Sequence, residues 1–144
     1  MQTTTNNCTN LACIIDDDAV YISLIKKVIE TKNLCNNLLV FKNGKQSLEY
    51  FQTQLLKFNN SQIPEIIFLD LNMPVMDGWE FIEHFKKIKS KFKKTIKLYV
   101  VSSSINPLDV DKAKSFSEVN DYIVKPIHIQ QLENIFLNRT LNTG

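Results

Sequence analysis

Four short apolar runs of the sequence are each followed at once by polar side chains that could do chemistry. The run at 11–15 precedes Asp16 and Asp17, the run at 66–69 precedes Asp70, the run at 97–101 precedes Ser102, and the run at 121–124 precedes Lys125. In an open parallel sheet, ligands bind beyond the carboxyl ends of the strands. If these runs are strands of one sheet, acids, a hydroxyl and an ammonium group meet at one edge.

The acids in this set require either retained protons or a bound cation. Adjacent strands lie about 5 Å apart, so Asp16 or Asp17 can approach Asp70. Two carboxylates about 4 Å apart repel by about 4 kcal/mol at an effective dielectric constant of about 20, so either a pKa rises or a cation sits between them. Oxygen ligands select a hard ion. Two or three carboxylates do not fill its coordination shell, and the remaining positions can be taken by water, as Mg²⁺ prefers. Mg²⁺, the Ser102 hydroxyl and Lys125 would together stabilise a phosphoryl group, with the Asp70 carboxylate as the available nucleophile.

Other residues beside these acids have structural explanations. Asp18 stands directly before an amphipathic stretch, where it can cap a helix and interact with the positive end of the helix dipole. Further along, Pro74 stops a strand from continuing. Asp77 and Gly78 then form a turn, and a helix starts near Trp79.

Apolar runs alternate with amphipathic segments along the chain. A fifth apolar run lies at 37–41. All five runs are too short for helices, and apolar and polar residues mostly do not alternate within them, as in strands that are buried on both faces. Apolar residues recur at helical spacing in the segments 21–29, 48–58, 81–88, 110–116 and 129–136. This alternation predicts an α/β fold with right-handed crossovers, a parallel five-stranded sheet and helices on both of its faces.

Length and composition indicate one domain. The chain has 144 residues, of which 44% are hydrophobic and 22% charged, the profile of an ordinary globular protein. We predict a flexible segment at 1–10, a single domain at 11–140 and a tail at 141–144. The N-terminal segment lacks the apolar stretch of a secretory signal, and no later run approaches the roughly 20 apolar residues of a membrane helix. We therefore expect a cytoplasmic location without membrane contact.

Charge, histidine and cysteine patterns argue against nucleic acids and transition metals as ligands. The net charge is only +2, and the seven lysines at 85–97 are interrupted by apolar residues at helical spacing, as on a solvated helix face. His84 and His128 have no partner ligand at metal-binding spacing. The three cysteines lack zinc-finger or redox spacing, so we expect reduced thiols.

Four motifs of the sequence resemble the receiver domain of bacterial two-component response regulators. They are IIDDDAV, FLDLNMPVMDG, VVSSS and DYIVKP. The motifs stand in the order found in that family, and the resemblance covers about 11–136. It implies a stand-alone receiver with a flavodoxin-like (βα)5 three-layer sandwich and the strand order 2-1-3-4-5.

The resemblance implies roles for individual residues, carried over by motif position. Asp70 would be the phosphorylated residue, and Lys125 would bind the phosphoryl group. Asp16, Asp17 and Asp70 would hold Mg²⁺ together with the backbone carbonyl of Asn72.

The resemblance also implies a switch and a cis peptide bond. Ser102 would be the switch hydroxyl and Tyr122 the switch aromatic, although an aromatic residue in a strand can equally be a core residue. The peptide bond before Pro126 would be cis. Two features depart from the family pattern: Ser102 replaces the more frequent Thr, which loses some stiffness at χ1, and the segment 115–120 lacks a glycine that is common there.

These residues predict a signalling protein rather than an enzyme. It would take a phosphoryl group from a phosphohistidine of a histidine kinase or histidine phosphotransfer protein onto Asp70, and would then dock to a downstream protein or to a second copy of itself. The expected docking face combines the segments 110–116, 121–124 and 129–136. Its candidate rim contacts are Lys112, His128 and Gln131.

Two alternatives stay open at this point. A Mg²⁺-dependent phosphatase with an aspartyl-phosphate intermediate would use the same nucleophile. Such enzymes usually carry a second Asp two residues after the nucleophile, where Asn72 supplies no acid for a leaving group. A pseudo-receiver would act as a binding module without phosphorylation, and the complete set of acids, hydroxyl and lysine argues against it.

Overall fold

The fold is a five-stranded parallel sheet between two layers of helices, in a computed structural model that describes residues 9–57 and 60–137. The strands are β1 (Thr9–Ile15), β2 (Cys35–Phe41), β3 (Ile66–Leu69), β4 (Lys97–Ser102) and β5 (Val119–Val124). The helices are α1 (Ala19–Thr31), α2 (Gly44–Lys57), α3 (Gly78–Ile88), α4 (Pro107–Lys114) and α5 (Ile129–Leu137), with short 3₁₀ turns at Asn60–Gln62 and Lys89–Lys91. The strand order β2-β1-β3-β4-β5 confirms the predicted topology.

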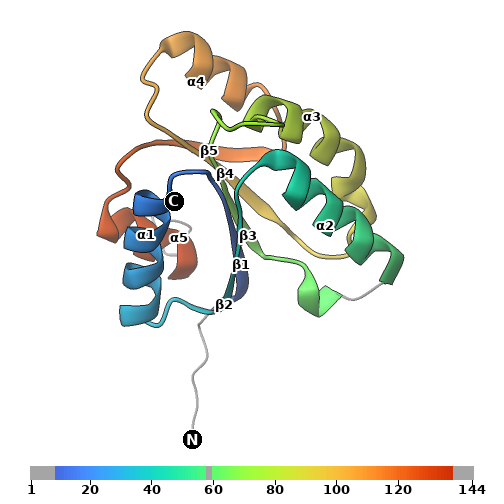
Figure 1. The fold of residues 1–144 in the computed structure, drawn as a ribbon, viewed down its shortest axis with the longest axis horizontal. Helices are drawn as coiled ribbons and strands as arrows, with labels where there is room; N and C mark the ends of the chain where they lie inside the picture. Colours follow the sequence, from blue (N-terminus) through green and yellow to red (C-terminus); the bar gives the residue numbers. More distant parts are fainter. Residues whose placement is uncertain (1–8, 58–59, 138–144) are drawn as a thin grey trace, which may run out of the picture.

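The helices divide between the two faces of the sheet (Figure 1). Helices α1 and α5 cover one face, and α2 and α3 cover the other, with α4 continuing that second layer beside β4 and β5. Every strand pairs in parallel with its neighbours. All carboxyl ends of the strands therefore lie at one edge of the sheet, as the sequence predicted.

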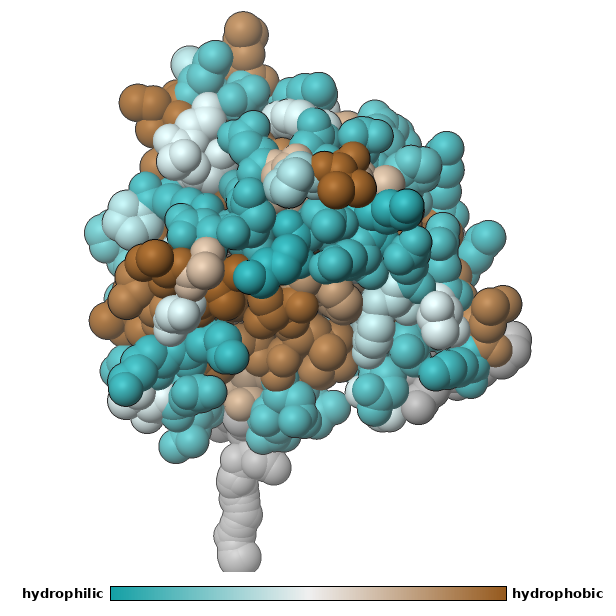
Figure 2. Space-filling model, in the orientation of Figure 1, coloured by the Kyte–Doolittle hydropathy of each residue, from teal (hydrophilic) through white to brown (hydrophobic). Residues whose placement is uncertain are grey.

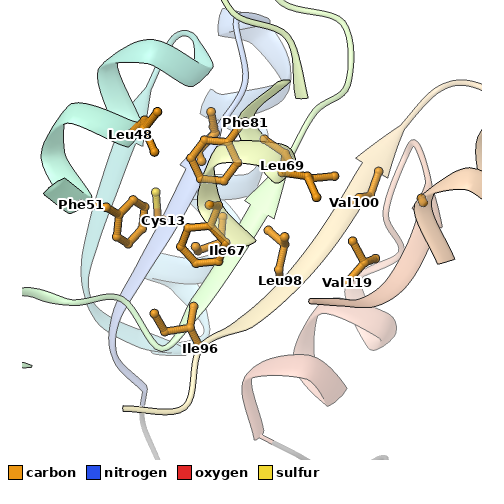
Figure 3. Packing of buried hydrophobic residues seen from close by; sticks show 14 of the residues in the cluster. Cys13, Leu48, Phe51, Ile67, Leu69, Phe81, Ile96, Leu98, Val100 and Val119 are labelled. Atoms are coloured by element: carbon orange, nitrogen blue, oxygen red, sulfur yellow. The ribbon is translucent and has the colours of Figure 1, made fainter. Parts of the chain in front are cut away.

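Aromatic side chains fill the layer beneath α2 and α3 (Figure 3). Phe51 of α2 and Phe81 of α3, both labelled in Figure 3, are fully buried. Phe85 of α3 is also fully buried, and its ring centroid lies 5.3 Å from that of Phe81. They belong to the same cluster as Ile67 at the centre of β3. Because aromatic pairs add to the free energy gained from buried area alone, this layer fixes α3 firmly against the strand that precedes it.

A mainly aliphatic layer holds α1 and α5 to the opposite face. Ile22, Ile25 and Ile29 of α1 recur at helical spacing and are buried, as are Leu132 and Phe136 of α5. This periodic apolar stripe is what anchors a surface helix to a sheet. The first turn of α1 is therefore held close to the end of β1.

Strand β1 begins earlier than predicted. Thr9 and Asn10, which we placed in a flexible segment, belong to the strand. The Thr9 N–H donates to the Leu34 carbonyl (3.2 Å), and the Asn10 N–H donates to Glu65 Oε1 (2.8 Å). These bonds to distant residues extend the strand beyond its apolar run. Most of the predicted N-terminal segment and the predicted tail lie outside the described residues.

Helix α4 begins at the Asn-Pro pair at 106–107 and ends before Phe116. The Asn106 side chain accepts a hydrogen bond from the Leu108 N–H (3.0 Å), and Pro107 at the first helical position has no N–H to satisfy. Phe116 follows the helix and packs against the core beneath α2 and α3. The other predicted elements agree with the structure to within a few residues, and the last residue of the predicted segment 48–58 lies outside the described residues.

The surface carries hydrophobic side chains over α1 and near α4. Figure 2 shows hydrophobic surface over α1 and toward β2, and a smaller group at α4. Val20 and Leu24 of α1 and Leu108 of α4 are among the exposed large apolar side chains. Within residues 9–57 and 60–137, none of the helices combines the length and apolar character needed to cross a membrane.

Candidate functional site

The pairing of β1 with β3 places two of the predicted acids side by side. Ile15, the last residue of β1, is in register with Leu69, the last residue of β3. Asp16 and Asp70 directly follow these two residues and therefore lie side by side. The Asp70 N–H donates to the Ile15 carbonyl (2.9 Å), which extends the ladder to the acid itself. The backbone therefore fixes the separation of these side chains.

Three carboxylates form what we call the acid pocket, made of Asp16, Asp17 and Asp70. One oxygen from each lies within 4.8 Å of the others. Asp16 is 1% exposed and Asp70 7% exposed, while Asp17 is open to solvent. The pocket thus has a buried floor and an open mouth, and its oxygen donors suit a hard divalent cation.

Lys125 reaches the acid pocket from β5. Its N–H donates to the Ser102 carbonyl (2.8 Å), and the Lys125–Pro126 peptide bond is cis, as the resemblance implied. The Lys125 ammonium lies 2.8 Å from Asp16 Oδ2 and 3.8 Å from Asp70 Oδ1. One cation is therefore shared unequally between two buried acids.

The environment of Asp70 favours its protonated form. Burial, followed by the negative charge of Asp16, raises the pKa of Asp70 from 3.8 to about 6. The Lys125 charge and a hydrogen bond from the Leu71 N–H act in the opposite direction but do not offset burial. A second cation in the pocket would offset the cost of ionising Asp70. Because a pKa of about 6 lies below neutral pH, most molecules at pH 7 still carry the Asp70 carboxylate that a nucleophile requires.

Asp18 caps α1, as predicted. Its Oδ1 accepts hydrogen bonds from the N–H groups of Val20 (3.1 Å) and Tyr21 (3.2 Å). Its own N–H donates to Asp16 Oδ1 (2.9 Å). The cap therefore ties the start of the helix to the pocket and holds the buried acid in one orientation.

The loop after Asp70 folds tightly back on its own strand. The Gly78 N–H donates to the Leu71 carbonyl (2.9 Å), and Asp77 caps α3 by accepting from the Glu80 N–H (2.9 Å). A Cβ atom on Gly78 would lie 2.4 Å from the Asp70 carbonyl oxygen. Glycine is therefore required for α3 to start this close to the acid. Asn72 lies exposed in this loop, and its carbonyl stays a predicted metal ligand.

Ser102 and Tyr122 are joined through a residue that we did not predict, Ser104. Ser102 is fully buried, and its Oγ accepts from the Ser104 N–H (3.1 Å). The Tyr122 hydroxyl donates to the Ser104 carbonyl (2.8 Å), and the Ser104 hydroxyl donates to Asp109 Oδ2 (2.6 Å). The loop between β4 and α4 is thus bonded both to its own helix and to β5. Tyr122 is largely buried against the core and also hydrogen-bonded to this loop.

Tyr21 is the second residue of the site that sequence reasoning missed. The Lys125 ammonium lies 4.4 Å from the centre of the Tyr21 ring. We had assigned Tyr21 only to the apolar stripe of a helix, and nothing in its local sequence signals contact with a lysine so far along the chain. The outcome of the other candidates is plain: Asp16, Asp17, Asp70 and Lys125 come together, and Ser102 stands beside them on β4.

The sheet has the strand order β2-β1-β3-β4-β5, with acids after β1 and β3 and a lysine after β5. The chain is therefore an α/β protein with a polar pocket at the topological switch point of its sheet. Residues 12–136 match the family model of the response regulator receiver domain. The chain belongs to this family, whose members are signalling domains of two-component systems.

Individual relatives agree with this assignment. The response regulator Rcp1 of Synechocystis sp. is 27% identical over 127 residues, which cover 88% of this chain and 84% of Rcp1. A structure of the Mn²⁺-bound form of Rcp1 aligns with a TM-score of 0.69 at 25% identity and covers 90% of each chain. A two-component response regulator of Cytophaga hutchinsonii aligns with a TM-score of 0.80 at 27% identity, covering 94% of this chain and 98% of its own. The phosphorylated cyanobacterial phytochrome response regulator RcpA aligns with a TM-score of 0.65 at 26% identity, covering 95% and 97%.

Proposed function

We propose that this protein is a phosphoacceptor that takes a phosphoryl group onto Asp70 from a phosphohistidine of a histidine kinase or phosphotransfer protein. The observation that carries the proposal is the buried Asp70 carboxylate beside two further acids, with the Lys125 ammonium 3.8 Å from Asp70 Oδ1. The phosphorylated form of the related RcpA supports the same chemistry. Because Asp70 is acceptor rather than hydrolytic catalyst in this proposal, the protein signals and is not an enzyme acting on small substrates.

The transfer is a displacement at phosphorus. An Asp70 carboxylate oxygen forms the new O–P bond while the N–P bond of the phosphohistidine breaks, and the electron pair of that bond stays on the imidazole nitrogen. Lys125 stands where it can interact with the negative oxygens of the moving phosphoryl group. The main contribution of the protein is therefore positioning and charge.

The acid pocket is also proposed to hold Mg²⁺. Asp16, Asp17 and Asp70 would supply carboxylate oxygens, and Asn72 would supply its backbone carbonyl. The bound ion would offset the negative charge that gathers when a phosphoryl group meets these acids. The fit rests on the 4.8 Å cluster of donor oxygens, on the raised pKa of Asp70 and on the Mn²⁺ bound by the related Rcp1.

The output is proposed to pass from Ser102 and Tyr122 to the face formed by α4, β5 and α5. A phosphoryl group on Asp70 would offer acceptor oxygens to the Ser102 hydroxyl, and Tyr122 is already bonded to the adjoining loop. Val124 and Ile129 are exposed apolar side chains on this face, so a downstream protein or a second copy can dock there. The proposed rim contacts are Lys112, His128 and Gln131, of which Lys112 also lies over the Trp79 ring (4.4 Å).

The proposal is tested by incubating the full chain with acetyl phosphate and Mg²⁺ and measuring intact mass. One added phosphoryl group is expected in the wild type and in Asp111→Asn, a matched control at an exposed position on α4. No addition is expected in Asp70→Asn. The same yield in Asp70→Asn as in the wild type would refute the assignment of the acceptor.

A further inference from the structure

Tyr21 and Lys125 meet at the acid pocket although they come from opposite ends of the chain. The Lys125 ammonium lies 4.4 Å from the centre of the Tyr21 ring, well inside the roughly 6 Å at which a cation is attracted to an aromatic face. The Lys125 side chain is only 16% exposed. Three groups therefore surround this ammonium: the Asp16 carboxylate, the Asp70 carboxylate and the ring.

We propose that Tyr21 is a positioning residue, whose ring face holds Lys125 over the acid pocket and thereby sets the rate of phosphoryl transfer to Asp70. The inference rests on the proposed function, since the rate in question is that of Asp70 phosphorylation. Tyr21 itself contacts neither a reacting atom nor a metal in this role. It acts through the position of the lysine.

The two acids alone do not hold Lys125 toward Asp70. The ammonium is closer to Asp16 Oδ2, at 2.8 Å, than to Asp70 Oδ1, at 3.8 Å. Any cation that engages Asp16 weakens the shorter ion pair, and the lysine side chain then regains conformational entropy by leaving the site. The uncharged Tyr21 ring, unlike the carboxylates, is not a ligand for such a cation. Its attraction for the ammonium persists when the charge of Asp16 is neutralised.

The ring is itself fixed in place and stays neutral. The Tyr21 N–H donates to the capping side chain of Asp18 (3.2 Å), and the ring packs against the core between α1 and the sheet. Burial, and then the charges of Asp16, Asp70 and Asp18, raise the pKa of the Tyr21 hydroxyl. The aromatic face, not a phenolate, is therefore what Lys125 meets.

The first test compares Tyr21→Phe with Tyr21→Leu in the full chain. Phosphorylation by acetyl phosphate is followed over a range of donor concentrations, and Mg²⁺ affinity is measured by calorimetry. Tyr21→Phe keeps the ring, so its rate should stay within about twofold of the wild type. Tyr21→Leu should lower the limiting rate about threefold to tenfold, the range of a partly desolvated cation–π contact, without changing Mg²⁺ affinity. Tyr50→Leu, a tyrosine of α2 outside the pocket, should keep the wild-type rate and controls for loss of stability alone.

A second measurement does not depend on phosphorylation. The ring current of Tyr21 should shift the NMR signals of the Lys125 ε-methylene protons upfield in the wild type and in Tyr21→Phe, and the shift should vanish in Tyr21→Leu. Lys125→Gln identifies these signals by their loss. In a Lys125→Gln background, Tyr21→Leu should cause no further loss of rate.

Each contrary result separates the possible errors. If the wild type takes no phosphoryl group, the proposed function fails, and the NMR shift alone decides whether the ring holds Lys125. If the wild type is phosphorylated and Tyr21→Leu reacts as fast, the inference fails while the proposed function stands. An equal loss of phosphorylation rate in Tyr21→Phe and Tyr21→Leu would also overturn the inference, because the Tyr21 hydroxyl and not its ring would then determine the rate.

Discussion

Replacing Asp70 by Asn should make the metal-free protein more stable at neutral pH. Asp70 is almost fully buried, and its ionised form is disfavoured by burial and by the neighbouring charge of Asp16. Asparagine has nearly the same shape and carries no charge. The variant that is expected to lose phosphorylation is therefore expected to gain free energy of unfolding.

The size of the gain follows from the pKa of Asp70. The pKa is raised from 3.8 to about 6 on folding, which corresponds to at most about 3 kcal/mol at pH 7. Solvent at the open mouth of the pocket screens part of this electrostatic cost, so we expect Asp70→Asn to gain about 1–3 kcal/mol of free energy of unfolding at pH 7. Because the folded pKa is raised, the folded state binds more protons than the unfolded state between about pH 4 and 6. Wild-type stability therefore falls as pH rises through this window, whereas the variant lacks this contribution.

The assay is urea unfolding in the presence of EDTA, at pH 4 and at pH 7. At pH 7, Asp70→Asn should exceed the wild type by about 1–3 kcal/mol, and at pH 4 the difference should shrink to less than about 1 kcal/mol. Asp111→Asn removes a charge at an exposed position on α4. It should match the wild type within about 0.5 kcal/mol at both pH values.

Two results would refute the reasoning. A gain of equal size at both pH values would show that asparagine packs better for reasons unrelated to ionisation. A loss of stability at pH 7 would show that the ion pair with Lys125 outweighs burial, and that Asp70 is not strained in the metal-free state. Adding Mg²⁺ supplies an internal check, because it should raise the stability of the wild type far more than that of Asp70→Asn.

Three further predictions concern the cap, the loop and the switch. Asp17→Ala should weaken Mg²⁺ binding severely in a calorimetric titration, whereas Asp18→Ala should lower the free energy of unfolding by about 1 kcal/mol and leave affinity nearly unchanged; the reverse pattern would contradict the roles given to these acids. Gly78→Ala should destabilise the protein by about 1–3 kcal/mol in urea, because its Cβ meets the Asp70 carbonyl, and a neutral effect would mean that the loop yields easily. Beryllofluoride, a phosphoryl mimic, should shift NMR signals around Tyr122 in the wild type but not in Ser102→Ala, and equal responses would exclude the proposed route.

The sheet and the acid pocket could be predicted from sequence because their signals are local. A parallel strand buried on both faces is a short apolar run, and the polar residue after it necessarily lies at the sheet edge. Asp16, Asp70 and Lys125 were found in this way, and in the structure the Lys125 ammonium lies 2.8 Å from Asp16 Oδ2 and 3.8 Å from Asp70 Oδ1. The strand order itself followed from the family resemblance rather than from the apolar runs.

The errors have different physical origins. The apolar spacing that extended to Phe116 ran past the end of helix α4 at Lys114, because Phe116 packs against the core from outside the helix. The extension of β1 to Thr9 depends on a hydrogen bond to Leu34, which no local pattern encodes. Tyr21 is the extreme case, because its contact with Lys125 exists only after both ends of the chain have folded onto the same edge.

Several strained features of the fold lie around Asp70. Asp70 holds a charge that burial disfavours, and Gly78 is needed because the helix starts against the acid's own carbonyl. Between them, Val75 has a positive φ of 68°, which a β-branched residue adopts only at a cost. The charge of Asp70 and the positive φ of Val75 each cost free energy, whereas Gly78 avoids a clash that any larger residue would meet. A cation that neutralises Asp70 would remove the cost of its buried charge at the point where the loop and α3 are anchored, so we expect binding there to affect the conformation of this loop.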